Sequence, residues 1–337
     1  MAVFLFHYYN IQLGSIENVF FQHWADLFKR AGYLGVDFFF TLSGFLITSI
    51  LLPRSRFDLR QFYIRRWLRL VPLYLLIVLI SYLVLPLIFS HQPISLPPLG
   101  YVLSFSANYF YTVHGDHYLF AITLLWSISV EMQFYLFWGG LLRFFKQYLY
   151  VLAIFLILLS LLLKYFLYGK CSLYYLTASY IPDFMIGAIG AKLIYEHVLN
   201  LTAIQKWIKL SIYVAVLSVF ILTPYLKTFY LWQLVDNCVY ATLTIAVILD
   251  QCADGSLIEL GRSRLISYLG KVSYGIYCFQ GFVLPLYSKL FLAHFMDSSA
   301  VVKVVLVPLC LFVVMGLLAA VSYRYFESYL LSLRSPA

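Results

Sequence analysis

Four ionisable side chains stand out because they fall inside apolar stretches of the chain: His7, Asp37, Glu131 and Asp183. Placing such a group within a bilayer costs about 2.5–3.5 kcal/mol on insertion scales, so each one is a candidate functional residue. An imidazole and a carboxylate in this setting can accept, hold and release protons. The sequence therefore predicts proton-transfer chemistry inside a membrane, either in catalysis or in transport.

Each of the four also has a simpler structural interpretation. His7, in FLFHYYN, lies near one end of its segment and could reach the membrane interface or bond to a neighbouring helix. Asp37 and Asp183 lie near expected helix starts, where an acid caps the helix and interacts favourably with its dipole. Glu131, in LLWSISVEMQFYLFW, is far from any expected loop. It is therefore the strongest functional candidate of the four.

The composition indicates which elements must position these residues. The chain has 337 residues, of which 63% are hydrophobic and 11% charged, whereas soluble domains carry about a quarter charged residues. We expect an all-α polytopic transmembrane helix bundle, with residues 1–337 forming one membrane domain and no soluble domain. A helix needs about 20 apolar residues to cross a bilayer, which predicts about ten spans. They are expected at residues 1–13, 34–52, 70–90, 119–142, 148–168, 174–195, 207–226, 230–249, 267–290 and 303–326.

Basic residues predict the orientation of these spans. If the N-terminus is cytoplasmic, most of the 23 lysines and arginines fall on the inner side, as the positive-inside rule requires. The C-terminus is then cytoplasmic too. The densest group, expected in a loop before residue 70, comprises Arg54, Arg56, Arg60, Arg65, Arg66 and Arg69. The net charge of +9 thus reflects topology, and we expect no nucleic-acid partner.

The first span is unusual, because residues 1–13 would extend only about 20 Å as a helix. We expect either that this helix is truncated in this chain or that its true start lies upstream. The segments at 14–33 and 91–117 are expected to be outer loops, either ordinary solvated loops or the rim of a pocket. The five cysteines are scattered without metal-ligand spacing, so we expect no metal site.

Five segments, in order along the chain, resemble motifs of the acyltransferase family 3 membrane proteins. They are GVDFFFTLSGFLIT (35–48), FYIRRWLRLVPLY (62–74), LLWSISVEMQFYLFW (124–138), YLGKVSYGIY (268–277) and SYRYFES (322–328). The resemblance implies an integral membrane O-acyltransferase, an enzyme that transfers an acyl group, most simply acetyl. The implied donor is cytoplasmic acyl-CoA, with no metal. The implied acceptor is a hydroxyl of an extracytoplasmic carbohydrate, such as a surface polysaccharide or its lipid-linked precursor.

The resemblance also implies a place in the cell. We expect a multi-pass protein of the bacterial inner membrane, surrounded by membrane lipid and working alongside other proteins of cell-envelope glycan assembly. Its residue roles follow from the matching motifs. His7 stands where the family has its first-helix histidine, which implies a general base or acyl relay, and Glu131 or Asp37 would orient that imidazole.

The implied donor-binding residues are Arg65, Arg66 and Arg69, whose guanidinium groups match phosphates bidentately, together with Tyr63, Ser43 and Gly44. Two alternatives stay open for this group. The arginines could serve membrane topology alone, and the Ser43–Gly44 pair could be a small-residue contact between helices. The implied acceptor-binding residues are Trp126, Ser129, Gln133, Tyr135 and Asp183.

The chain departs from the family pattern at three places. The usual arginine about eleven residues before the histidine would precede Met1, Gln280 stands where many relatives have a histidine, and no extracytoplasmic hydrolase-like domain follows the last span. The alternative functions are a polytopic transporter or exporter, in which the buried histidine and acids relay protons, and a membrane subunit without catalysis.

Overall fold

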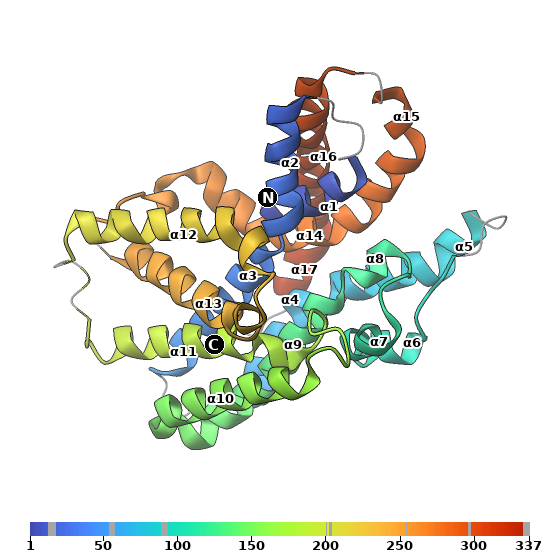
Figure 1. The fold of residues 1–337 in the computed structure, drawn as a ribbon. Helices are drawn as coiled ribbons and strands as arrows, with labels where there is room; N and C mark the ends of the chain where they lie inside the picture. The colour runs from blue at the N-terminus through green and yellow to red at the C-terminus, as the bar shows by residue number, and fades with distance from the viewer. Residues whose placement is uncertain are drawn as a thin grey trace.

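The computed structural model describes residues 1–12, 18–53, 58–88, 94–199, 201, 204–253, 255–295 and 298–332. Within these ranges the regular elements are all helices, and no strand occurs (Figure 1). The predicted all-α fold is therefore confirmed. Arg54 and Arg56 of the predicted arginine group lie outside the described residues.

The long helices are α3 (Leu34–Leu51), α4 (Leu59–Leu79), α9 (Trp126–Phe145), α10 (Leu149–Leu167), α11 (Thr177–Tyr195), α12 (Lys206–Leu226), α13 (Tyr230–Cys252), α14 (Arg264–Leu290) and α16 (Val307–Ser322). The shorter helices are α1 (Ala2–Gln12), α2 (Val19–Ala31), α5 (Leu85–Ile88), α6 (Leu99–Leu103), α7 (Ala107–His114), α8 (Phe120–Thr123), α15 (Leu292–Phe295) and α17 (Ser328–Ser332). A π-helical turn joins α4 to α5, and another joins α16 to α17.

Six helical segments of the described chain are long and apolar enough to cross a membrane, judged by length and composition. They are Leu34–Leu51, Leu59–Leu87, Phe120–Leu167, Lys206–Leu226, Tyr230–Cys252 and Val302–Ser332. Every predicted span contains a helix, but the predicted number of about ten crossings is not confirmed. The long helices α11 and α14 are not among the six, and Phe120–Leu167 contains α9 and α10 within one segment.

Helix α3 lies at the centre of the molecule (Figure 1) and packs along α11 and against α13. Two glycines allow the backbones of α3 and α11 to touch. A Cβ at Gly44 would lie 2.1 Å from the carbonyl oxygen of Phe184, and a Cβ at Gly187 would lie 2.1 Å from that of Thr41. No larger residue fits at either glycine without displacing the partner helix.

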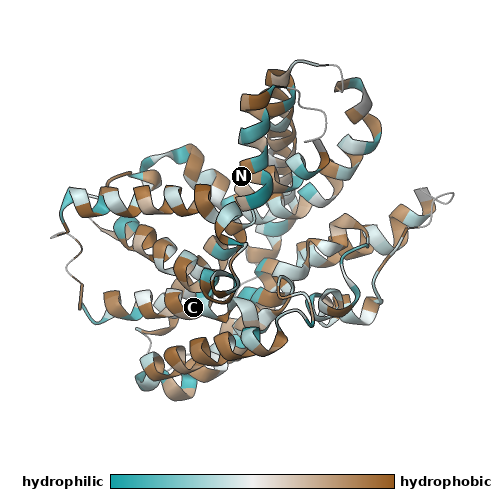
Figure 2. Cartoon of the chain, viewed as in Figure 1, coloured by the Kyte–Doolittle hydropathy of each residue, from teal (hydrophilic) through white to brown (hydrophobic). Residues whose placement is uncertain are grey.

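Apolar residues are frequent along most of the helices (Figure 2), and many large apolar side chains are exposed. Helix α10 shows the pattern clearly, since Val151, Phe155, Leu158 and Leu162 on one face are all more than half exposed. The opposite face buries residues at a similar spacing, among them Lys164. Exposed apolar side chains in a continuous stripe are suited to contact with lipid, and the polar residues are directed inward.

From Leu59 onward the arginine segment is helical, so the prediction of a loop that extends to residue 70 was wrong. Helix α4 begins at Leu59, and the Asp58 side chain caps it by accepting a hydrogen bond of 2.8 Å from the backbone N–H of Arg60. The segment that follows is rich in arginine and leucine, which are good helix formers, and an aspartate at the cap stabilises the first turn. Arg65 and Arg69, four residues apart, therefore share one face of a rigid helix.

The predicted outer loops also contain helices. Helix α2 occupies most of the segment at 14–33, where Asn18 caps it by accepting a bond of 3.2 Å from the N–H of Phe21. This helix contacts α1 and α12. The segment at 91–117 contains α6 and α7. Residues of both segments, Lys29, Arg30 and Asp116 among them, line the site described below.

Candidate active site

Several of the predicted site residues line three cavities, each named here after one residue that lines it. The His7 chamber has a volume of about 670 Å³, the Glu131 chamber about 580 Å³ and the Asp37 chamber about 510 Å³. All three volumes lie in the range of small-ligand sites, about 300–1,000 Å³.

Helix α1 supplies the ring of His7 to the first chamber, together with Phe6 and Asn10. The imidazole packs edge-on against Phe6 and Phe120, with ring centroids 4.8 and 4.9 Å away. Among the described residues, no hydrogen bond or ion pair holds this imidazole. Within the described part of the chain, aromatic packing is therefore what positions the ring.

The far wall of the His7 chamber is aromatic and polar. Trp126 packs against Tyr174 and Tyr175, with centroids 4.9 and 5.5 Å apart. The Tyr175 hydroxyl donates a bond of 2.6 Å to the Asp116 carboxylate. Lys29, Arg30 and Lys227 line the chamber as well.

Glu131 is 2% exposed and lies on α9 at the wall of the second chamber. Its Oε1 accepts hydrogen bonds from the hydroxyls of Ser43, at 2.8 Å, and Tyr135. Its Oε2 is buried and has no hydrogen-bond partner among the described residues. The carboxylate is thus fixed by one oxygen and keeps the other for a ligand.

The His7 and Glu131 chambers adjoin each other. Helix α1 contributes Val3 and Phe4 to the Glu131 chamber but Phe6 and His7 to the other. At the junction, the Tyr277 hydroxyl donates a bond of 2.7 Å to the Leu124 carbonyl and lies 2.6 Å from the Ser127 hydroxyl. Leu124 lines the His7 chamber, whereas Ser127 and Tyr277 line the Glu131 chamber. Hydrogen-bonded residues from the linings of the two cavities therefore meet at this point.

The predicted donor-binding residues divide between the chamber and its surroundings. Arg69 lines the Glu131 chamber. The guanidinium of Arg66 lies 5.7 Å from the centroid of the Tyr135 ring, and the Tyr63 hydroxyl donates a bond of 2.9 Å to the Leu136 carbonyl. Arg65 lines none of the cavities described here, and Gly44 serves the contact between α3 and α11.

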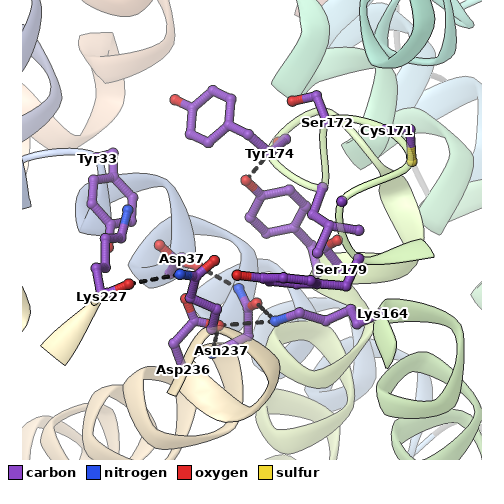
Figure 3. Close-up of a pocket in the computed structure, with 15 residues that line it drawn as sticks. Tyr33, Asp37, Lys164, Cys171, Ser172, Tyr174, Ser179, Lys227, Asp236 and Asn237 are labelled. Carbon is purple, nitrogen blue, oxygen red and sulfur yellow. Dashed lines mark hydrogen bonds and ion pairs between the residues drawn. The ribbon is translucent and has the colours of Figure 1, made fainter. Parts of the chain in front are cut away.

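Among the described residues no hydrogen bond joins Asp37 to His7, the imidazole that Asp37 or Glu131 was predicted to orient. Asp37 accepts a hydrogen bond of 2.7 Å from the Asn237 side chain (Figure 3). The same side chain donates to Asp183 at 3.0 Å. Glu131 makes no bond to His7 either. Among the described residues, the structure therefore brings neither predicted carboxylate to the imidazole.

A network around Asp37 was missed in the sequence. Lys164 of α10 donates to Asp236 and Asn237 of α13, each at 2.9 Å, and its side chain is 3% exposed (Figure 3). Lys164 and Asp236 both fall inside predicted spans, so the rule that selected His7 and Glu131 could have found them. Asn237 carries no charge and gave no such signal.

Lys227 is a further residue that the sequence did not single out. It follows the end of α12, lines both the His7 and Asp37 chambers, and its ammonium group lies 3.6 Å from the centroid of the Tyr33 ring. Burial lowers the pKa of Lys227, although the nearby Asp236 carboxylate acts in the opposite direction.

The predicted acceptor-binding residues are spread over several environments. Trp126 lines the His7 chamber and Tyr135 bonds to Glu131. Ser129 donates to the Leu125 carbonyl at 3.2 Å inside α9. Gln133 lines a separate cavity of about 430 Å³ and donates to the Phe105 carbonyl at 2.6 Å. Asp183 lines none of these four cavities.

Gln280, where many relatives were expected to carry histidine, is buried at the Glu131 chamber, and its Nε2 has no partner within the described residues. No group of three or more histidine, cysteine or acidic side chains that could hold a metal ion occurs in the part of the chain that the structure describes.

Comparison with known proteins defines the class. A family model described as an acyltransferase domain matches residues 1–324, and the chain therefore belongs to the acyltransferase family 3. No solved structure matches the chain significantly.

Particular relatives are peptidoglycan-modifying proteins by name. The chain is 33% identical over 148 residues to the peptidoglycan O-acetyltransferase OatA of Listeria monocytogenes, a match covering 40% of the chain and 23% of that relative. It is 32% identical over 136 residues to the putative peptidoglycan O-acetyltransferase YrhL of Bacillus subtilis, covering 37% and 21%. It is 25% identical over 346 residues to the O-acetyltransferase OatA of Staphylococcus aureus, covering 93% and 55%. The chain thus spans at most about half the length of these relatives.

Proposed function

We propose that this chain is an integral membrane O-acyltransferase that moves an acetyl group from acetyl-CoA on the cytoplasmic side to a hydroxyl of an envelope carbohydrate on the other side. Peptidoglycan, or a lipid-linked precursor of it, is the acceptor that the relatives' names suggest. The observation that carries the proposal is the junction of two chambers, one lined by His7 and the other by Glu131 and Arg69.

In the proposed reaction, His7 acts as the general base. An alcohol is a weak nucleophile near neutral pH, and an imidazole is well matched to accept its proton. As the acceptor oxygen attacks the thioester carbonyl, the C–O bond forms, His7 takes the hydroxyl proton, and the C–S bond breaks. The CoA thiolate leaves and receives that proton. The edge-on contacts with Phe6 and Phe120 hold the imidazole at the wall of the His7 chamber.

The Glu131 chamber is the proposed donor site. Arg69 at this chamber, with Arg65 and Arg66 on the same helix, would bind the phosphates of CoA, because guanidinium groups match phosphate oxygens. The free Oε2 of Glu131 would accept a hydrogen bond from an amide N–H of the pantetheine arm. The acyl end of acetyl-CoA would then lie near Leu124, Ser127 and Tyr277, where the linings of the two chambers meet.

Replacement of the base tests this proposal. Membranes containing the wild-type protein should transfer label from radiolabelled acetyl-CoA to peptidoglycan, and His7→Ala should reduce the rate by about 10²-fold or more, the usual loss when an acid–base group is removed. His23→Ala is the matched control, since His23 bonds only to the carbonyl of Val19 in its own helix among the described residues. His7→Ala protein that keeps the wild-type rate would refute the proposed role.

Transport is the competing function, and the buried network of Lys164, Asp236 and Asn237 is the feature that would serve it. Ionisable groups within a membrane also form proton relays in transporters. The same assay separates the two functions, because a transporter leaves no covalent label on any acceptor.

A further inference from the structure

The Asp37 chamber shares part of its wall with the His7 chamber. Tyr33, Ser172, Tyr174 and Lys227 line both cavities. Figure 3 shows Asp37, Lys164, Asp236 and Asn237 gathered at one side of this chamber, below Tyr174 and Ser172. Two cavities with a common wall can hold neighbouring parts of one ligand.

Two buried oxygen atoms in the Asp37 chamber have no partner. Asp37 is 2% exposed and Ser179 is 4% exposed, and both line the chamber. Asp37 Oδ2 and Ser179 Oγ make no hydrogen bond among the described residues. A buried polar atom left without a partner destabilises a protein. A ligand with hydroxyl groups would satisfy both oxygens.

Charged side chains of both signs line this chamber. The acids are Asp37 and Asp236, and the bases are Lys164 and Lys227. Lys164 and Asp236 are paired at 2.9 Å, and Asp37 already accepts from Asn237. This balance favours a neutral ligand that carries both donors and acceptors.

Aromatic side chains complete the wall, since Tyr168, Tyr174 and Tyr180 line the same cavity. The face of an aromatic ring offers an apolar surface, and a tyrosine also has a polar tip. Such rings suit the C–H face of a sugar, while the buried oxygens suit its hydroxyl groups. The chamber therefore has the properties of a neutral carbohydrate subsite.

We propose that the Asp37 chamber binds the neutral sugar unit next to the one that is acylated in the His7 chamber. This inference rests on the proposed acyltransferase function. It assigns Asp37 and Ser179 to acceptor binding, and Asp37 is then a binding residue rather than the partner that orients His7.

Two small substitutions test the subsite without removing an internal hydrogen bond. Ser179→Ala deletes only the unpartnered hydroxyl. Asp37→Asn keeps an oxygen for Asn237 and replaces Oδ2 by an amide donor. Ser81→Ala is the matched control, because the Ser81 hydroxyl is also buried without a partner among the described residues but lines none of the four cavities.

The assay uses purified protein in nanodiscs with labelled acetyl-CoA. The acceptors are the peptidoglycan disaccharide of N-acetylglucosamine and N-acetylmuramic acid, and each of the two monosaccharides. For the disaccharide, Ser179→Ala should raise KM about three- to tenfold, the effect of losing a neutral hydrogen bond. Asp37→Asn should raise it about tenfold or more, the effect of losing a charge-assisted hydrogen bond. KM for the monosaccharides, KM for acetyl-CoA and the melting temperature should stay at the wild-type values. Ser81→Ala should match wild type throughout.

The outcomes separate the subsite from the function. Wild-type disaccharide KM in both variants would overturn the subsite and leave the acyltransferase proposal intact. An equal rise for monosaccharides and disaccharide would also overturn it, because a second subsite can act only on the longer acceptor. Wild-type protein that labels no sugar would overturn the proposed function and the subsite together.

Discussion

Glu131 and Asp37 are two buried carboxylates with a similar hydrogen-bonding pattern but different surroundings. Each binds a partner with one oxygen and presents the other, unpartnered among the described residues, to a cavity. Glu131 is held by the hydroxyls of Ser43 and Tyr135 at a chamber with mainly apolar walls, where Arg69 is the basic residue among those that line it. Asp37 is held by an amide at a chamber with charges of both signs.

The comparison shows how one helix can serve two sites. Asp37 and Ser43 both lie on α3, and six residues correspond to about 9 Å along a helix. Each residue is tied to a different partner helix, α13 for Asp37 and α9 for Ser43. Proposed acceptor and donor binding therefore depend on the same helix, and substitutions can affect one chamber or both.

The largest effect on stability is expected from Lys164→Met. Removing one member of a buried ion pair leaves the other charge uncompensated and costs about 3–5 kcal/mol. Thermal melting in nanodiscs should show a much lower melting temperature, and adding Asp236→Leu should restore part of it. Lys170→Met, at an exposed position on the following turn, is the control. An unchanged melting temperature in Lys164→Met would show that the pair does not stabilise the Asp37 chamber.

Gly44→Ala should destabilise the helix packing that supports both chambers. Its Cβ would lie 2.1 Å from the Phe184 carbonyl oxygen, and overpacking of this kind costs about 1–3 kcal/mol. Melting temperature and transfer rate should both fall. The matched control is Gly140→Ala, whose Cβ would have Tyr63 Oη at 3.8 Å as its closest neighbour. If the two variants had the same melting temperature and transfer rate, the close contact between α3 and α11 would not determine either quantity.

Glu131→Gln should separate the chambers kinetically. The new amide keeps an oxygen for Ser43 and Tyr135 but loses the charge at Oε2, so KM for acetyl-CoA should rise about tenfold, the value of a charge-assisted hydrogen bond. KM for the glycan should not change. This is the reverse of the result expected for Asp37→Asn. A rise in glycan KM alone would mean that the two chambers have been assigned the wrong substrates.

The smallest effect is expected at Arg69, which is exposed although it lines the Glu131 chamber. Exposed ion pairs are worth about 0.2–1 kcal/mol, so Arg69→Ala should raise KM for acetyl-CoA only about two- to fivefold, and less in high salt. Lys206→Ala removes an exposed positive charge away from these cavities and should have no effect. Titrating KM against salt concentration measures the difference. Equal effects of the two substitutions would indicate a general charge effect rather than a phosphate site.

The residues bonded to Glu131 had each been singled out in the sequence, whereas Lys164, Asp236 and Asn237 near Asp37 had not. Glu131 and Tyr135 lie one turn apart on one helix, so a short motif contains both, and Ser43 lies in a second motif. The bond from Asn237 to Asp37 spans 200 positions and that from Lys164 to Asp236 spans 72. No local pattern encodes such pairings, because they depend on how α3, α10 and α13 pack.

Helix positions were predictable for a similar reason. Apolar runs placed a helix in every predicted span, whereas the start of α4 was missed because arginines lower the hydropathy without preventing a helix. Asp58 and the helix-forming residues after it were the available signal. The placement of His7 and Glu131 at different chambers could not be read from the sequence, since it depends on which residues of α1 and α9 face each chamber.

The central claim is that an acyl group passes from the Glu131 chamber to a hydroxyl in the His7 chamber, across the membrane. Proteoliposomes that hold labelled acetyl-CoA only inside and peptidoglycan oligosaccharide only outside test it directly, with vesicles of uniform protein orientation. We expect label on the outer glycan with wild-type protein and at least about a 10²-fold lower rate with His7→Ala. Label that appears only when both substrates are on the same side, or equally with His7→Ala, would contradict the claim.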